Sequence, residues 1–154
     1  MKKAQAWGID LIIATMIFSI GIVVFFVYSL NSPSDVKDKF QILTYEGENI
    51  INSILSNGEP DNWNENNVQK IGILNNGKIN ETKLNRFYHL SENDYQKTRE
   101  IFNTKYDYSF IIEGYEISYI GKEVNLNALN LIKITRFIIY KNKPATAYIY
   151  IWEE

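Results

Sequence analysis

Hydrophobic residues form one long block near the N-terminus and recur elsewhere in short periodic patterns. Of the 22 positions in residues 9–30, 17 are apolar, and Asp10 is the only ionisable residue among them. As an α-helix this block rises about 33 Å, enough to cross the roughly 30 Å hydrocarbon core of a bilayer. The block has no small-residue cleavage site after it, unlike a secretory signal. The pattern therefore predicts a transmembrane helix at residues 9–30.

The charges that flank this block predict its orientation. Lys2 and Lys3 precede it, within a short basic N-terminal segment of residues 1–8. The first charges after it cancel, because two acidic and two basic side chains alternate over residues 35–39. By the positive-inside rule the N-terminus lies in the cytosol. We therefore expect a single-pass protein of the cell membrane, with residues 31–154 outside the cell.

A second helix is predicted at residues 31–58. Ser32-Pro33-Ser34-Asp35 forms a capping box with proline at the first helical position, where a kink is expected, and Asn57-Gly58 ends the helix. Apolar residues recur at intervals of three and four, at Val36, Phe40, Leu43, Gly47, Ile50 and Ile54, flanked by Ile51 and Leu55. We interpret the segment as a stalk helix, or alternatively as an ordinary domain helix after an anchor. In either case we expect the stripe to be buried by the sheet that ends at residues 145–152.

The remaining segment, residues 59–154, is predicted to form an α+β head of mostly antiparallel strands. A polar, Asn-rich loop surrounds Trp63, and a short helix is expected at residues 93–102, capped by Ser91 or Asn93. Strands are expected at 68–74, 106–113 and 116–120, with turns at Asn75-Asn76-Gly77 and Gly114. The strongest pattern is a final hairpin of residues 131–140 and 145–152 around a turn at 141–144. In its second arm Ala147, Ile149 and Ile151 alternate with Tyr148, Tyr150 and Trp152, which predicts one aliphatic and one aromatic face.

Composition narrows the chemistry that this chain can perform. The net charge is −2, and the chain lacks the clustered Lys and Arg that a nucleic-acid interface needs. It also has no cysteine. The sole histidine, His89, has no second histidine to complete a zinc site, so we interpret it as a structural or surface residue. The eight glycines are scattered, and no phosphate-binding loop is present. We therefore expect no catalytic residue, no metal and no cofactor.

Two surface features leave alternatives open. Asn80-Glu81-Thr82 is an N-glycosylation sequon that the predicted topology places outside the cell, although this triplet also arises by chance. The Tyr-rich final hairpin is either a sugar- or protein-binding face or part of the core against the second helix.

The N-terminus, residues 2–10 followed by 20 mostly apolar positions, resembles the archaeal class of type IV pilin precursors, with a class III signal peptide. The head adds a softer similarity to uncharacterised archaeal pilin-like proteins. That similarity rests on Trp63, Asn67-Val68, Ile71-Gly72, residues 77–80, Thr82-Lys83-Leu84, Asp94-Tyr95, Tyr106-Asp107-Tyr108 and residues 149–153. The resemblance implies a type IV pilin-like fold, in which the N-terminal helix packs into a filament core and the head is displayed outside.

The resemblance also implies a processing site and partners. A prepilin peptidase cuts such precursors on the cytosolic side, which here points to Ala4, Gln5 and Ala6. Cutting after Ala4 makes Asp10 the sixth residue, and cutting after Gln5 makes it the fifth, the usual acidic position. Asp10 would then pair with a neighbouring subunit's N-terminal amine, or else stabilise the N-terminal end of its own helix. Ala14, Thr15, Ser19 and Gly21 offer small side chains for close packing between membrane helices.

These features predict a non-enzymatic, pilin-like structural subunit, major or minor, of an archaeal surface filament or its assembly complex. Its expected partners are other pilin-like subunits, the peptidase, the assembly machinery and the membrane. The alternative function is a signal-anchored extracellular binding domain that does not polymerise.

Overall fold

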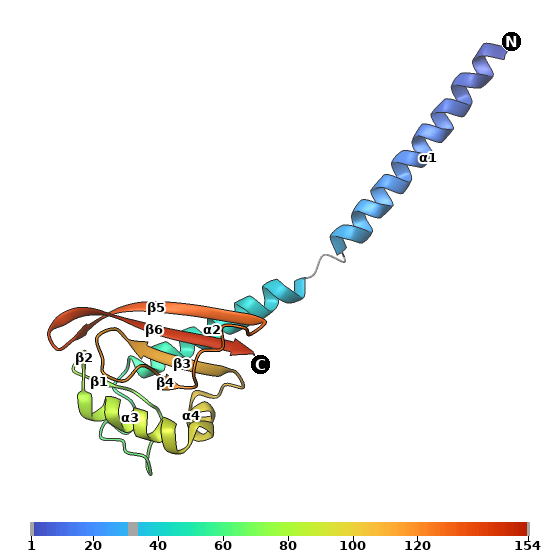
Figure 1. The fold of residues 1–154 in the computed structure, drawn as a ribbon. Coiled ribbons are helices and arrows are strands. Elements are labelled where there is room, and N and C mark those ends of the chain that lie inside the picture. The colour runs from blue at the N-terminus through green and yellow to red at the C-terminus, as the bar shows by residue number, and fades with distance from the viewer. Residues whose placement is uncertain (1, 31–33, 154) are drawn as a thin grey trace. The chain divides into compact units, whose positions relative to one another are not determined.

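The computed structural model describes residues 2–30 and 34–153, with the backbone alone for residues 2–7 and 34–36. The chain divides into two compact units, one ending at Lys37 and one beginning at Asp38, which we call the head unit. The described residues form four helices, a two-stranded sheet and a four-stranded sheet, which confirms the mixed α+β class (Figure 1).

The first unit is dominated by helix α1, Lys2–Leu30. The segment Gly8–Leu30 is long and apolar enough to cross a membrane, and none of it is buried within the chain. The helix begins at Lys2, so the basic N-terminal segment continues the same helix. The predicted kink at Pro33 and the first half of the capping box lie outside the described residues.

Helix α2, Ser34–Ile54, lies against one face of the four-stranded sheet. Leu43, Ile50 and Ile54 are fully buried, as the apolar stripe predicts. Gly47 brings the helix close to the sheet, because a Cβ atom there would lie 2.7 Å from Cδ1 of Ile134. The expectation for Phe40 was wrong, since 42% of it is exposed. The side chain of Val36 lies outside the described part of the chain.

The segment after α2 contains Trp63, around which the sequence predicts a polar loop. Trp63 is instead fully buried, and its Nε1 donates a hydrogen bond of 2.8 Å to the carbonyl oxygen of Gly72. The strand expected at residues 68–74 is mostly irregular, with one isolated bridge between Glu59 and Lys70. Only the end of that segment pairs, as hairpin β1, Leu74–Asn75, with β2, Lys78–Ile79. Its turn is the predicted Asn76-Gly77, where both residues have positive φ.

Two helices follow, and the first was not predicted. Helix α3, Glu81–Asn93, buries Leu84, Phe87 and Leu90, and helix α4, Tyr95–Phe102, confirms the second prediction. The cap of α4 is Asp94, whose side chain accepts a hydrogen bond from the Lys97 amide, and not Ser91 or Asn93. The leucine and phenylalanine spacing in α3 is helical, but the many polar residues between them hid it.

The main sheet has the order β4-β3-β6-β5 and is antiparallel throughout. Its strands are β3, Asp107–Ile112; β4, Ile120–Gly121; β5, Asn130–Tyr140; and β6, Lys143–Glu153. The strand expected at 116–120 was therefore wrong except at its last residue, although Gly114 does sit in a turn with φ of +81°. The final hairpin is confirmed, with a tighter turn of Lys141-Asn142, so Pro144 belongs to β6. Proline is tolerated there because β6 extends past the end of β3 and its outer edge is unpaired.

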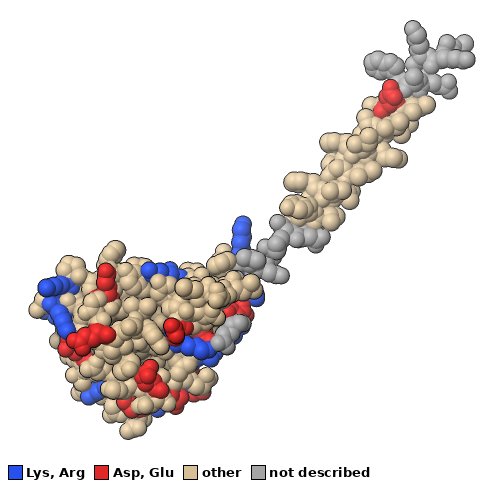
Figure 2. All heavy atoms as spheres, in the orientation of Figure 1, with Lys and Arg blue, Asp and Glu red and all other residues tan. Residues whose placement is uncertain are grey.

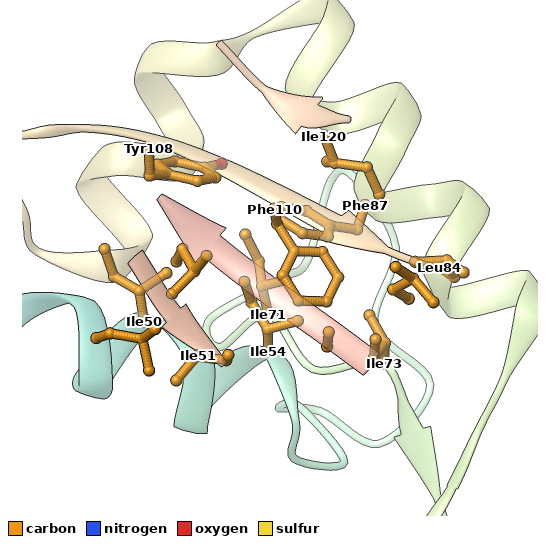
Figure 3. Packing of buried hydrophobic residues seen from close by; sticks show 14 of the residues in the cluster. Ile50, Ile51, Ile54, Ile71, Ile73, Leu84, Phe87, Tyr108, Phe110 and Ile120 are labelled. Carbon is orange, nitrogen blue, oxygen red and sulfur yellow. The ribbon is translucent and has the colours of Figure 1, made fainter. Parts of the chain in front are cut away.

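One face of this sheet forms the core. Tyr108, Phe110, Ile149 and Ile151 share that face by register and are all fully buried. Figure 3 shows Phe87 of α3 lying against Tyr108 and Phe110 of β3, with Ile50, Ile51 and Ile54 of α2 in the same cluster. The rings of Phe87 and Tyr108 are stacked with centroids 6.5 Å apart. The aliphatic residues of the final strand therefore face the core, as their alternation predicts.

Candidate functional site

The most unusual surface of this chain is helix α1 itself. Every described side chain from Gly8 to Leu30 is exposed, including the phenylalanines, valines and isoleucines that make up most of the segment. A helix that is apolar on all sides and has no buried residue is typical of a segment that lipid or another protein surrounds. The surface of α1 in Figure 2 shows one acidic side chain, and the head unit shows intermixed acidic and basic ones.

That acidic side chain is Asp10, the only ionisable residue in Gly8–Leu30. It is exposed, and α1 begins eight residues before it, about 12 Å along the helix axis. The favourable effect of a helix N-terminus on a carboxylate acts within the first turn. In the uncut chain this distance is too long for the helix end to act on Asp10, but cutting after Ala4 or Gln5 would shorten it to five or four residues, so both roles considered for Asp10 stay predictions. Ala4, Gln5 and Ala6 lie in the first turns of α1, and their side chains lie outside the described part of the chain.

The small residues of α1 offer fewer polar contacts to a second helix than their spacing alone indicates. The Thr15 hydroxyl donates a hydrogen bond of 2.8 Å to the Leu11 carbonyl oxygen of the same helix. Its hydrogen is therefore already committed. No atom outside its neighbourhood lies within 4 Å of a Cβ built on Gly21. These positions are available for close helix packing, and the Thr15 hydroxyl already has its partner.

The sequon asparagine has a structural role. Asn80 is the N-cap of α3, and its Oδ1 accepts a hydrogen bond of 3.1 Å from the Lys83 amide. The role of Asn80 as a helix cap is therefore enough to explain an asparagine at this position, whether or not it carries a glycan. Glycosylation at Asn80 stays a prediction.

The aromatic face of the final hairpin points away from α2. Tyr148 and Tyr150 are half-buried on the sheet face opposite Ile149 and Ile151, so core packing against the second helix is wrong for these two, whereas Trp152, the third aromatic residue of the alternation, is fully buried. Lys133 of β5 holds its ammonium 3.9 Å from the centroid of the Tyr148 ring and 5.4 Å from that of Tyr150. The rings are therefore already covered in part by a cation from the same chain.

Two buried polar groups were not found from the sequence. Lys83 is 4% exposed, and its Nζ donates to the carbonyl oxygens of Asn57 and Leu74 and to Asp61 Oδ1, at 2.9 to 3.0 Å. All three ammonium donors are thus satisfied, and the lysine joins the loop after α2 to the β1–β2 hairpin. This arrangement leaves no free amine for chemistry.

The second group is Asp107, at the start of β3. Its carboxylate accepts hydrogen bonds from the Tyr95 hydroxyl, at 3.0 Å, and from Lys122 Nζ, at 2.8 Å, and Arg99 lies 3.6 Å away. Burial, together with the neighbouring Asp107 charge, raises the pKa of Tyr95 above its ordinary value. Burial also raises the pKa of Tyr108, whose hydroxyl donates to Thr98. Both phenols are held neutral, which fits a structural network joining α4 to the sheet.

Metal binding finds no support in the part of the chain that is described. Residues 2–30 and 34–153 contain no group of three or more histidine and acidic side chains able to hold a metal ion. His89 lies on the exposed side of α3, next to Tyr88.

Exposed apolar residues of the head unit were also missed by the sequence patterns. Leu126, Leu129 and Phe137 are 79%, 88% and 90% exposed. The signal that could have found the first two is the absence of ionisable residues from 124 to 132, in a chain of which 22% is charged.

The fold and these surfaces together define a protein with one membrane-length apolar helix and an antiparallel α+β head unit. Comparison with protein-family models, with characterised proteins and with solved structures finds no match to this chain. The arrangement of elements, an apolar N-terminal helix followed by a head with an antiparallel sheet, is compatible with a pilin-like shape.

Proposed function

We propose that this protein is a non-enzymatic, pilin-like structural subunit of an archaeal cell-surface filament or of the complex that assembles it. The observation that carries the proposal is the uncovered apolar surface of α1, in one chain with a head unit that has its own core. A subunit that moves from a membrane into a filament core needs such a helix, because lipid surrounds it first and other helices surround it afterwards.

The proposal includes a place in the cell and a set of partners. Before assembly the chain crosses the membrane once, with its N-terminus in the cytosol and the head unit outside. A prepilin peptidase removes the basic leader at Ala4, Gln5 or Ala6. Other pilin-like subunits and the assembly machinery then bind the exposed helix.

The mature N-terminus separates this proposal from its rival, a signal-anchored binding domain that does not polymerise. We expect mass spectrometry of the protein from its native host to find a chain that starts at Gln5 or Ala6. The rival predicts an intact N-terminus at Met1 or Lys2, because an anchor needs no processing. An intact N-terminus in membranes and in any isolated filaments would contradict the proposed processing.

Asp10 provides a test of assembly that is independent of processing. Asp10 lies at the edge of the apolar block. A carboxylate carried to the centre of a bilayer would be unfavourable by about 2.5 to 3.5 kcal/mol on insertion scales, and a neighbouring subunit's free amine would offset a cost of this kind. We expect Asp10→Ala to leave membrane insertion and head folding unchanged, while the variant's incorporation into filaments or complexes falls, as measured by quantitative blotting. Tyr28→Phe is the matched control, because it removes one polar group from the other end of α1 at an exposed residue outside the small-residue set. Assembly of Asp10→Ala at the level of the control would rule out the pairing role.

A further inference from the structure

Helix α2 and strand β5 run in the same direction, which gives the head unit two distinct ends. At the first end Lys39 Nζ lies 3.1 Å from Glu153 Oε2, and Glu153 pairs with Asn130, the first residue of β5. Further along, Glu48 reaches Arg136 at 3.4 Å. We call the end that contains Lys39, Glu153 and Asn130 the near end, because α2 enters the head unit there. The turn Lys141-Asn142 marks the far end, and Figure 1 shows the two at opposite ends of β5.

The near end carries an uncharged loop with two exposed leucines. Residues 124–132 contain no ionisable side chain, and Leu126 and Leu129 are almost fully exposed within them. The loop has defined structure, since the Ala128 amide donates to the Asn125 carbonyl oxygen at 3.2 Å and the Asn127 amide donates to Asn125 Oδ1 at 3.0 Å. This turn holds Leu126 outward at a fixed place.

Helix α2 adds apolar surface at the same end. Phe40 and Ile42 adjoin Lys39 in sequence, and both side chains remain exposed although Leu43 beside them is buried. Exposed apolar side chains at the end of a domain indicate a surface that is covered in the working protein. The far end also exposes Phe137 and Ile139, so the position of α1 along the chain must distinguish the two ends.

Chain length indicates what covers this end. Only residues 31–37 lie between Leu30, the last residue of the apolar helix, and the head unit that begins at Asp38. Seven residues span at most about 25 Å even when fully extended. If α1 crosses a bilayer, the chain holds the near end within that distance of the end of α1, whereas the far end is separated from the near end by the length of β5.

We propose that the near end of the head unit contacts the surface of the bilayer that α1 crosses, with Leu126 and Leu129 inserted at the boundary of headgroups and acyl chains. The contact is apolar in origin, because the two leucines that make it lie in residues 124–132, which contain no charged side chain. It requires α1 to span a membrane, but it does not require the protein to polymerise. It would place the head unit on the membrane before any assembly.

The test uses the full chain in vesicles, with a fluorophore on a single cysteine. The chain has no cysteine of its own, so Leu129→Cys, Phe137→Cys and Val24→Cys each give one labelled position. Phe137 is the matched control, since it is an equally exposed apolar residue that lies on β5 nearer the far end, whereas Leu129 directly precedes this strand. Val24 reports whether α1 is inserted. The vesicles contain phosphatidylcholine alone, or phosphatidylcholine with an anionic lipid, at high lipid-to-protein ratio.

We expect the Leu129 label to be quenched by lipids that carry a quencher about 5 to 10 Å below the headgroups and to be shielded from aqueous iodide. The Phe137 label should show the opposite behaviour, equally in both lipid mixtures. Equal iodide quenching at Leu129 and Phe137, with Val24 in the bilayer, would overturn the proposal. Protection of Leu129 only at high protein density would also overturn it, because it would indicate a second copy of the chain. A Val24 label in water would overturn both this contact and the membrane role of α1.

A pair of variants separates insertion from mere proximity. With the label at Asn127, which is exposed between the two leucines, the double change Leu126→Gln and Leu129→Gln should restore iodide quenching to the Phe137 level. The matched double change Phe137→Gln and Ile139→Gln should leave the Asn127 label shielded. Unchanged shielding in both doubles would show that the leucines do not make the contact.

Discussion

Leu43→Asp is expected to unfold the head unit, whereas Phe40→Asp, one turn earlier on the same helix, leaves it folded. Leu43 is 1% exposed and belongs to the cluster beneath the sheet, so an ionised carboxylate there would lose its water without gaining a partner. An uncompensated buried charge destabilises by about 3 to 5 kcal/mol, which is much of the 5 to 15 kcal/mol that stabilises a typical domain. Phe40 is 42% exposed, so an aspartate in its place stays hydrated.

The measurement is thermal unfolding of the full chain in detergent micelles, followed by the near-ultraviolet signal of the buried Trp63 and Trp152. The sequence pattern alone predicts that both substitutions unfold the head, since both positions belong to the apolar stripe. Equal melting temperatures for the two variants would therefore contradict the structure, whether both heads unfold or both stay folded.

Gly72→Ala is the second substitution with a large expected effect. A Cβ atom at Gly72 would overlap the backbone nitrogen of Gly58 and would lie 2.5 Å from the carbonyl oxygen of Ser56. These are backbone atoms, which cannot rotate away as a flexible side chain can. The neighbouring Gly58 has φ of +78° and packs against the Trp63 ring, so the two chain segments cannot separate without exposing that tryptophan. We expect a loss of about 3 kcal/mol or more.

Gly77→Ala is the matched control for this substitution. Gly77 has φ of +76° in the β1–β2 turn, but nothing lies within 4 Å of the place that an added Cβ atom would occupy. The left-handed backbone alone should destabilise Gly77→Ala by about 1 to 2 kcal/mol. Denaturant unfolding of both variants measures the difference. A Gly72→Ala loss no larger than that of Gly77→Ala would show that the crossing of the two segments relaxes easily.

Periodic elements could be predicted because their signal is local. The apolar block of α1, the stripe of α2 and the alternation in β6 each repeat over many residues, and burial of one face follows directly from such repetition. Helix α4 and the final hairpin were also found this way. Helix α3 was missed because three core residues, Leu84, Phe87 and Leu90, are separated by polar ones, and Asn80 was interpreted as a glycosylation site although it is the N-cap of the helix.

Turns and single buried residues were harder to predict, because residue type is only a weak indication of the conformations on which they depend. The Lys141-Asn142 turn places a lysine at φ of +50°, a conformation more usual for glycine or asparagine, so the sequence predicts a wider turn. Trp63 has polar neighbours in the sequence. It is buried because the chain folds back and places Gly72 beside it, a contact that no local pattern indicates.

By itself, therefore, the sequence determined a membrane-length helix, an amphipathic helix after it and an α+β class with a final antiparallel hairpin. Each depends on hydrophobic periodicity along a few consecutive turns or residue pairs. Only the tertiary structure decided that Phe40 is exposed while Leu43 is buried, that Lys83 and Asp107 are satisfied inside the head unit, and that Leu129 shares an end with Lys39. The physical reason is that these properties arise from contacts between segments far apart in the chain, which no local pattern records.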